Sequence, residues 1–438
     1  MLERIFRLSK NNTNIQTETI GGATTFMTMA YIIFVNPMIL KDAGVPFEGA
    51  VSATCLAAGI ATLLMGLWAN YPFALAPGMG LNAMLAYSVV LANNYSWQAA
   101  MGIVFVEGAV ILVLVLLGAR EAVMRAIPDD LRRAIGVGIG VFIAFIGLAN
   151  AGIVRRSDAT LLTHGDVASP DSLLAVFGLL LTLLFLLRRV RGALLLGIIL
   201  TTLVGMALTN VSALKLDLVR FPEKALSIPS LETIGRVDLH AVLRGGLDSL
   251  TLIFAFLMVD FFDTLGTVTG LGEQAGYTSD GKLLPRLNRV LAVDSIGAVT
   301  GGLFGASSVT TYIESAAGIG EGARSGLACV IVAFLFFLSA FLSPIVGIVP
   351  PAATAPALIV TGFLMMGVVR KINFSRIESA FPAFIILILI PLTYSISRGI
   401  GYGFIAYSFA TLFTGRFLKV SPLFHLVSLL FLISFVLG

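Results

Sequence analysis

A succession of long apolar stretches limits what this chain can fold into. Fourteen stretches dominated by apolar side chains, most of about 17 to 25 residues, follow one another between residues 17 and 418. A helix of that length crosses the hydrocarbon core of a bilayer, which is about 30 Å thick. Because 58% of the 438 residues are hydrophobic and only 12% are charged, a water-soluble domain is excluded. We therefore predict an all-α polytopic membrane protein.

The predicted spans, in chain order, are 17–40, 48–68, 73–91, 97–117, 129–152, 171–189, 192–210, 247–271, 287–304, 306–321, 324–343, 353–370, 380–396 and 399–418. One more apolar stretch, 421–437, is shorter. The sequence leaves open whether this last stretch crosses the bilayer or lies in its interface.

The basic residues predict the orientation of the chain. The net charge of +4 lies in short connections, which indicates membrane topology rather than nucleic-acid binding. With a cytoplasmic N-terminus, most basic residues fall in loops that the span count places inside the cell. These are Arg120, Arg125, Arg132, Arg133, the run RRVR at 188–191, Lys282, Arg286, Arg324, Arg370, Lys371, Arg376, Arg416 and Lys419. The exceptions are Lys41, Arg155, Arg156 and scattered charges in 211–246. The charged N-terminal segment lacks a signal-peptide pattern. We predict a multi-pass cell-membrane protein with both termini cytoplasmic.

Two of the predicted spans contain residues that interrupt helices. YPFALAPGMGLNAMLAY (71–87) carries prolines and glycines in its first half, and GASSVTTYIESAAGIG (305–320) opens with small and β-branched residues. Each predicts an extended segment followed by a half-helix, which survives at membrane depth only inside protein or beside a water-filled cavity. They are the third and tenth spans, so they occupy the same position in two groups of seven. Because seven is odd, such a repeat is inverted, and its matched interruptions predict a transporter binding site.

Two carboxyl groups, Asp260 and Asp263, interrupt the apolar eighth span. Their three-residue spacing places them on one helix face, which Thr264 and Thr267 extend. Ionised carboxylates are costly to bury in lipid, so they normally face a cavity and mark a path for substrate or protons. The alternative is an aspartate at a helix end that reaches the cytoplasmic edge. The mid-span position of Asp263 argues against that alternative.

The two interrupted spans each carry a polar residue where the half-helix is expected to begin. Glu314 lies in the tenth span, where unpaired backbone N–H groups favour an anion. Thr310 and Thr311 are candidates to cap the same end. Asn82 is the counterpart in the third span, and its amide offers the donor and the acceptor that a heterocycle requires. A lone asparagine also serves as a contact between membrane helices.

The remaining polar residues indicate no second chemistry. Glu107, in the fourth span, is either a partner of the site or a packing residue. The three histidines have no neighbouring residues with metal-ligand spacing, and the chain has neither a phosphate-binding loop nor a hydrolase motif. We therefore predict that the protein is not an enzyme, binds no metal and needs no cofactor beyond a proton gradient.

Four motifs together resemble one family of transporters. They are TTFMTMAYIIFVNP (24–37), ALAPGMGLNA (74–83), DFFDTLGT (260–267) and TTYIESAAG (310–318). The chain resembles the azaguanine-resistance-type (AzgA-like) purine permeases, a branch of the nucleobase–cation symporter and nucleobase–ascorbate transporter group. The resemblance extends from about residue 3 to residue 420.

The resemblance implies a substrate site. The family's eighth-span acids fall on Asp260 and Asp263, its tenth-span acid on Glu314 and its third-span amide on Asn82. Within the same motifs we also expect Thr28, Tyr31 and Ile313 at the substrate. Glu314, Asp263 and Asp260 are the expected proton-coupling residues. Which of the two aspartates contacts the base is left open.

The resemblance also implies a fold and an activity. Two inverted repeats of seven spans form a core domain, residues 1–117 and 247–343, and a gate domain, residues 118–246 and 344–438. The implied function is secondary active uptake of purine nucleobases by proton symport, with an elevator-like or rocking core. Hypoxanthine and guanine are the expected preferred substrates, and adenine is a further candidate. The expected partners are the purine base, protons, the lipid bilayer and a second copy of the chain in a homodimer, without nucleic acid.

Two other classes of function are alternatives. An anion or other small-solute transporter or channel on the same fold is the main alternative, but it predicts a neutral or basic residue in place of Glu314. A membrane enzyme or receptor requires a catalytic set or a soluble ligand domain. The longest predicted loop, about 211–246, is too short for such a domain.

Overall fold

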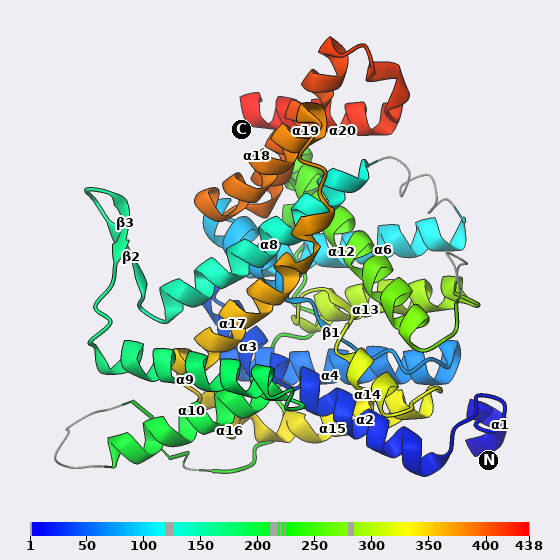
Figure 1. The fold of residues 1–438 in the computed structure, drawn as a ribbon, viewed down its shortest axis with the longest axis vertical. Coiled ribbons are helices and arrows are strands. Elements are labelled where there is room, and N and C mark those ends of the chain that lie inside the picture. The colour runs from blue at the N-terminus through cyan, green and yellow to red at the C-terminus, as the bar shows by residue number, and fades with distance from the viewer. Residues whose placement is uncertain are drawn as a thin grey trace.

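The chain folds into a bundle of helices with very little sheet (Figure 1). The computed structural model describes residues 2–118, 127–210, 218–219, 221–222, 224–278 and 284–437. Three of the basic residues predicted to be cytoplasmic, Arg120, Arg125 and Lys282, lie outside the described residues.

The first half of the chain contains the elements up to residue 209. In order they are α1 (Leu2–Phe6), α2 (Ile15–Met29), α3 (Ile32–Asp42), α4 (Phe47–Leu64), the π-helical turn η1 (Met65–Ala69), β1 (Leu75–Pro77), α5 (Met79–Ala83), the π-helical η2 (Met84–Ala92), α6 (Trp97–Leu116), α8 (Asp129–Asn150), β2 (Val154–Ser157), β3 (Leu161–His164), α9 (Pro170–Leu187) and α10 (Ala193–Thr209). Side-chain caps set several helix starts, since Asn14 and Ser96 accept backbone N–H groups at the first turns of α2 and α6.

The second half begins after the loop that precedes residue 239. Its elements are α11 (Leu239–Arg244), α12 (Gly246–Gln274), α13 (Leu287–Phe304), β4 (Val309–Thr311), α14 (Ser315–Gly320), α15 (Leu327–Ser339), η3 (Ala340–Leu342), α16 (Ser343–Gly347), α17 (Pro351–Met365), η4 (Met366–Lys371), α18 (Ile377–Thr393), α19 (Ile396–Phe413), η5 (Phe417–Lys419) and α20 (Pro422–Leu437). Here η3, η4 and η5 are short 3₁₀ helices.

Each predicted span coincides with helical structure. The third and tenth spans are a short strand followed by a helix, as predicted: β1 leads into α5, and β4 leads towards α14. Within the described residues, eight helices are long and apolar enough to cross a membrane, and four further apolar helices are shorter. The protein is therefore a multi-pass membrane protein, and the count of fourteen spans stays a prediction.

The two halves of the chain are interleaved rather than side by side. The helix α6 packs on α13, and α4 packs on α15. In the same way, α8 contacts both α17 and α18. Every one of these contacts joins an element of the first half to an element of the second half, so neither half buries its apolar faces alone.

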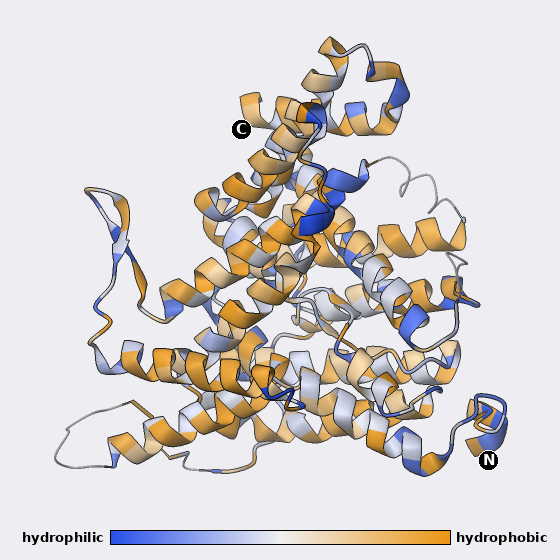
Figure 2. Ribbon diagram, in the orientation of Figure 1, coloured by the Kyte–Doolittle hydropathy of each residue, from blue (hydrophilic) through white to orange (hydrophobic). Residues whose placement is uncertain are grey.

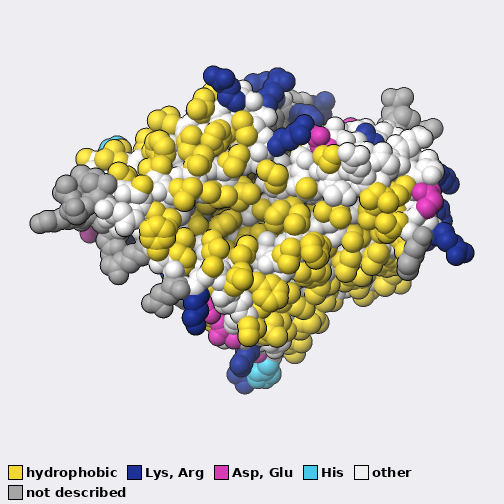
Figure 3. Space-filling view, turned by 90° about the horizontal axis from the view of Figure 1, so that it is seen from below, with side chains coloured by type: hydrophobic (Ala, Val, Ile, Leu, Met, Phe, Trp, Pro, Cys, Tyr) yellow, Lys and Arg dark blue, Asp and Glu magenta, His cyan; other side chains and the backbone are white. Residues whose placement is uncertain are grey.

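The outer surface of the bundle is apolar over the length of its helices. Most helix turns are hydrophobic, and hydrophilic residues gather at the helix ends and in the N-terminal segment (Figure 2). One face is a broad hydrophobic surface with its charged side chains at the margins (Figure 3). Exposed side chains such as Phe177, Leu180 and Phe334 lie within α9 and α15. A surface of this kind is suited to lipid.

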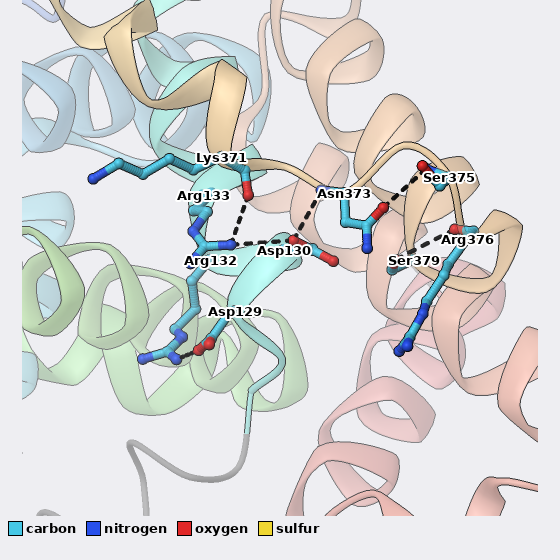
Figure 4. Close-up of polar contacts among 9 residues, drawn as sticks. All are labelled: Asp129, Asp130, Arg132, Arg133, Lys371, Asn373, Ser375, Arg376 and Ser379. Atoms are coloured by element: carbon cyan, nitrogen blue, oxygen red, sulfur yellow. Dashed lines mark hydrogen bonds and ion pairs between the residues drawn. The ribbon is translucent and has the colours of Figure 1, made fainter.

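A polar junction links the start of α8 to the segment between η4 and α18 (Figure 4). Asp130 accepts hydrogen bonds from the Arg133 guanidinium at 3.3 Å and from the Asn373 backbone N–H at 3.2 Å. Arg133 also donates to the carbonyl oxygen of Lys371 at 2.7 Å, and Arg132 pairs with Asp129. Arg132, Arg133 and Lys371, basic residues predicted to share the cytoplasmic side, therefore lie close together.

The last helix, α20, runs antiparallel to α19. Near its start, His425 contacts Ser408, which lies in the second half of α19. Near its end, Ser434 donates to Asp248 in the first turn of α12 at 2.8 Å. The N- and C-termini lie at opposite sides of the picture in Figure 1. The helix α20 thus packs along α19 and reaches the first turn of α12.

A buried carboxylate fastens the N-terminal helix α2 to the start of α15. Glu18 is fully buried, and its carboxylate accepts the backbone N–H of Arg324 at 2.7 Å and of Ala328 at 3.2 Å.

The substitution Glu18→Ala leaves both N–H groups without an acceptor. Hydrogen bonds to charged groups contribute about 1.5–3 kcal/mol each, so we expect a clearly lower Tm in detergent. Asp158→Ala, at a side chain that is 97% exposed, is the control and should leave Tm unchanged. An equal Tm for both variants would contradict this role of Glu18.

Candidate functional site

Two broken spans meet at the centre of the molecule. The strands β1 and β4 pair antiparallel, with Leu75 opposite Thr311 and Pro77 opposite Val309. Side chains from neighbouring segments satisfy the remaining backbone groups. The hydroxyl of Thr62 bridges the N–H and the carbonyl of Leu75, both at 2.9 Å, and Ser315 accepts the Ala74 N–H at 2.9 Å. Extended backbone therefore persists at membrane depth because protein partners replace water.

Glu314 lies directly before α14, at the position that the sequence predicts. Its carboxylate accepts a hydrogen bond from the hydroxyl of Tyr31 at 2.8 Å. The hydroxyl of Thr28 donates within α2 and also lies 3.3 Å from the Glu314 carbonyl oxygen. The structure therefore brings three of the predicted residues together, two from the first motif and one from the last.

Close packing of α2 on α14 explains how these residues meet. A Cβ atom on Gly318 would lie 2.2 Å from the hydroxyl oxygen of Thr25 and 2.3 Å from the carbonyl oxygen of Gly21. Only glycine permits that approach. The crossing point lies one helical turn after Glu314, so it positions the Glu314 carboxylate against α2.

One side of α12 is open and faces this group. Asp263 is exposed, and Cβ atoms added at Gly266 and Gly270 would meet no other atom within 4 Å. We call Asp263, Gly266, Thr267 and Gly270 the open face of α12. Ile313, beside Glu314, is 53% exposed. Asp263 and Glu314 are close enough to interact electrostatically. Two acids from different spans of the second half of the chain therefore flank accessible space.

Asn82 is fully buried, unlike Glu314 and Asp263. Its side chain is fully buried in α5, and its amide nitrogen donates to the Pro77 carbonyl oxygen at 3.3 Å. The amide oxygen has no hydrogen-bond donor among the described residues. Tyr312 donates to the same Pro77 carbonyl oxygen at 2.5 Å. Asn82 thus supports the end of β1 while one of its polar atoms stays unpaired.

The two aspartates of the eighth span have different surroundings, although the sequence predicts a shared face. Asp260 is fully buried and its carboxyl group contacts that of Glu107 on α6, whereas Asp263 is exposed. Side chains three residues apart on a helix point about 60° away from each other. That rotation is enough to point one carboxyl group into the packed interface and the other into the open face.

Asp294, on α13, is a functional candidate that the sequence analysis did not single out. Its buried carboxylate accepts the hydroxyl of Thr264 at 2.7 Å and both the hydroxyl and the N–H of Thr311 at 2.8 Å. Thr310 lies 3.5 Å away. The two threonines considered as caps of the half-helix therefore lie in β4 and bind Asp294 instead. An acid in the middle of the predicted span 287–304 was the available signal.

The described residues contain no group of three or more His, Cys, Asp or Glu side chains arranged to hold a metal ion. The polar groups at the centre are carboxylates, hydroxyls and one amide. Such a set suits a neutral ligand that offers hydrogen-bond donors, or a proton.

A model of the permease family matches residues 16–402 of the chain. The chain belongs to the permease family. Three relatives illustrate its place there. A Methanocaldococcus jannaschii relative, named as a permease without a substrate, is 48% identical over 99% of this chain and 98% of its own. The adenine permease AdeP of Escherichia coli is 40% identical, over 100% of this permease and 96% of its own chain. The guanine/hypoxanthine permease PbuG of Bacillus subtilis is 41% identical, over 99% of both chains. This chain is therefore a member of a family of transporters and not of a family of enzymes.

Solved structures support the fold of this permease. The transmembrane domain of the cyanobacterial bicarbonate transporter BicA matches with a TM-score of 0.66 at 18% identity, covering 88% of this permease and 97% of that chain. The structure of SLC26A9 matches with a TM-score of 0.65 at 11% identity, covering 94% of this permease and 68% of that chain. These likenesses concern the fold alone.

Proposed function

We propose that this permease is a secondary active transporter that takes up purine nucleobases. The observation that carries the proposal is the full-length similarity, at about 40% identity, to permeases named for adenine and for guanine and hypoxanthine. The two substrate classes are represented at nearly equal identity. Similarity alone therefore supports a purine base, and the choice among purines must come from the chemistry of the site.

The proposed substrate site lies between the open face of α12 and Glu314. In this proposal the carboxylates of Asp263 and Glu314 accept ring N–H groups of the base, and Ile313 contacts its flat face. Thr28 and Tyr31 hold Glu314 in place through the contacts described above. Asn82 supplies a further amide from the first repeat. At low dielectric, each hydrogen bond to a carboxylate contributes more than it does in water.

We also propose the domain division and the inverted repeat. Helix contacts recur in matched pairs when seven spans are exchanged: α6 on α13 corresponds to α15 on α4, and α2 on α14 corresponds to α12 on α5. These pairs fall within the proposed core, residues 1–117 and 247–343. Contacts of α8 with α17 and α18 fall within the proposed gate, residues 118–246 and 344–438. Transport is proposed to move the core past the gate, by an elevator-like or rocking motion, in a homodimer.

The proposed orientation places the N-terminus in the cytoplasm. If α20 crosses the bilayer after the fourteen predicted spans, the C-terminus lies outside the cell. That outcome would depart from the prediction of two cytoplasmic termini. The open face of α12 extends towards Gln274, which donates to the carbonyl oxygen of Ala316 in α14, and α14 packs on α2 near the N-terminus. In this orientation, the proposed site opens towards the cytoplasm.

The alternative, an anion transporter or channel, gains support only from fold likeness at low identity. Both acids that flank the proposed site would repel an anion. A carrier of neutral, donor-bearing bases suits this site better.

The test of the proposal is uptake of labelled hypoxanthine by cells expressing the permease, in competition with each unlabelled nucleobase. Hypoxanthine and guanine present N1–H beside a carbonyl group, whereas adenine presents a bare N1 acceptor that a carboxylate repels. A site that pairs with a donor discriminates against ligands that lack it. We therefore expect 6-oxopurines to compete at lower concentrations than adenine. Stronger competition by adenine would overturn this preference, and no competition by any purine would overturn the proposed function.

A further inference from the structure

Two carboxyl groups lie in contact inside the helix packing, away from the open face of α12. Glu107 of α6 and Asp260 of α12 are both fully buried, and their carboxyl groups are within hydrogen-bonding reach of each other. None of their four oxygen atoms receives an N–H or O–H group from any described residue. The pair therefore has only itself as a partner within the described part of the chain.

Two carboxylates in contact cannot both stay ionised in a buried site. Their mutual repulsion adds to the cost of removing each charge from water, and one proton held between them relieves both. With a proton, one carboxyl group donates an O–H to the other, and the paired oxygens acquire a hydrogen bond. The charged groups that act on the pair from neighbouring positions are Asp294 on α13 and Asp263 on α12, and both are acids. Their negative charges favour a bound proton further.

The other acids near the centre of the molecule differ from the pair in their surroundings. Asp294 is surrounded by threonine donors at 2.7–2.8 Å. Glu314 receives the hydroxyl of Tyr31 at 2.8 Å, and Asp263 is exposed on the open face. Asp294 and Glu314 each have a hydrogen-bond donor, and Asp263 lies at the surface of the structure. The contrast singles out the Glu107–Asp260 pair.

We propose that Glu107 and Asp260 share one proton and form the proton-carrying site of this permease, separate from the site that contacts the base. The proton arrives from the side of higher proton activity, rests on one carboxyl group and leaves to the other side of the membrane, with no bond made or broken besides O–H. Because Asp260 and Asp263 lie on the same helix three residues apart, the charge of the pair acts directly on the proposed base site. The role in coupling rests on the proposed function, whereas the shared proton does not.

The experiment is infrared spectroscopy of the purified permease in detergent at neutral pH, without substrate. The carbonyl stretch of a protonated carboxyl group is separate from the bands of carboxylates and backbone amides. We expect the wild-type protein to show such a band, and the band to be lost or shifted in both Glu107→Gln and Asp260→Asn. The control variant is Asp158→Asn, at the exposed turn between β2 and β3, and it should leave the band unchanged.

A band that is unchanged in either pair variant overturns the shared proton. If a variant fails to fold, carbon-13 labelling of the carboxyl groups in the wild-type protein provides the test, because the heavier isotope shifts the carbonyl stretching band. In wild-type protein, labels in the aspartate carboxyl groups and labels in the glutamate carboxyl groups should each shift the band. No shift with the glutamate label would overturn the role of Glu107. Because no purine is present, failure here is distinguishable from failure of the proposed function. If the band behaves as expected, loss of proton-driven accumulation in Glu107→Gln then supports the role in coupling.

Discussion

Loss of uptake is the expected result of replacing Glu314 with alanine. The carboxylate of Glu314 is the proposed acceptor for a ring N–H of the base, and it is held by the Tyr31 hydroxyl at 2.8 Å. Removing it deletes a charge-assisted hydrogen bond to the substrate and leaves Tyr31 without its partner. Hydrogen bonds to charged groups contribute about 1.5–3 kcal/mol each, and a loss of 2.8 kcal/mol corresponds to about a hundredfold weaker interaction. Initial rates of labelled hypoxanthine uptake provide the measurement.

The matched control for this prediction is Glu321→Ala. Glu321 is a glutamate seven residues further along the same segment, and it pairs with Arg191, whose side chain is 62% exposed. We expect Glu321→Ala to transport at close to the wild-type rate. The amount of each variant in the membrane must be measured in parallel, so that lost uptake is separated from lost protein. Near wild-type uptake by Glu314→Ala would remove Glu314 from the substrate site.

Collapse of accumulation with a protonophore is the second large effect that we expect. We propose that buried carboxyl groups on the path bind and release protons, so that a proton gradient drives uptake. With one proton per base, each unit of pH difference across the membrane supports about a tenfold accumulation. Proteoliposomes that contain the purified permease and an acidic exterior should accumulate hypoxanthine. A protonophore should return the internal concentration to that of the medium.

A second condition of that experiment distinguishes sodium coupling from proton coupling. It applies a sodium gradient with equal pH on both sides of the membrane. We expect it to drive no accumulation. Accumulation driven by sodium and insensitive to the protonophore would contradict proton symport, while leaving the assignment of a purine substrate intact. The two assays therefore separate the coupling ion from the transported base.

Much of the candidate site was predictable because membrane helices tolerate few polar residues. Asp260, Asp263 and Glu314 stand out in apolar surroundings, and a buried charge without a role is costly. The prolines and glycines of 71–87 likewise predicted the broken span that forms β1 and α5. Asp294 and the pair of Glu107 with Asp260 were not predictable as a cluster. Their residues belong to different helices, and spacing along one helix says nothing about which neighbour a side chain meets.

The sequence by itself determined the class of this protein, its helical spans and the short list of polar residues at membrane depth. The reason is that the bilayer imposes one rule everywhere, which requires apolar side chains and internally paired backbone over a fixed length. The tertiary structure decided which of those polar residues meet. It placed Glu314 against Tyr31, surrounded Asp294 with threonine hydroxyls and turned Asp260 away from Asp263. Such pairings depend on how helices far apart in the chain rotate and cross, and close contacts such as Gly318 on Gly21 exist only once the helices are packed.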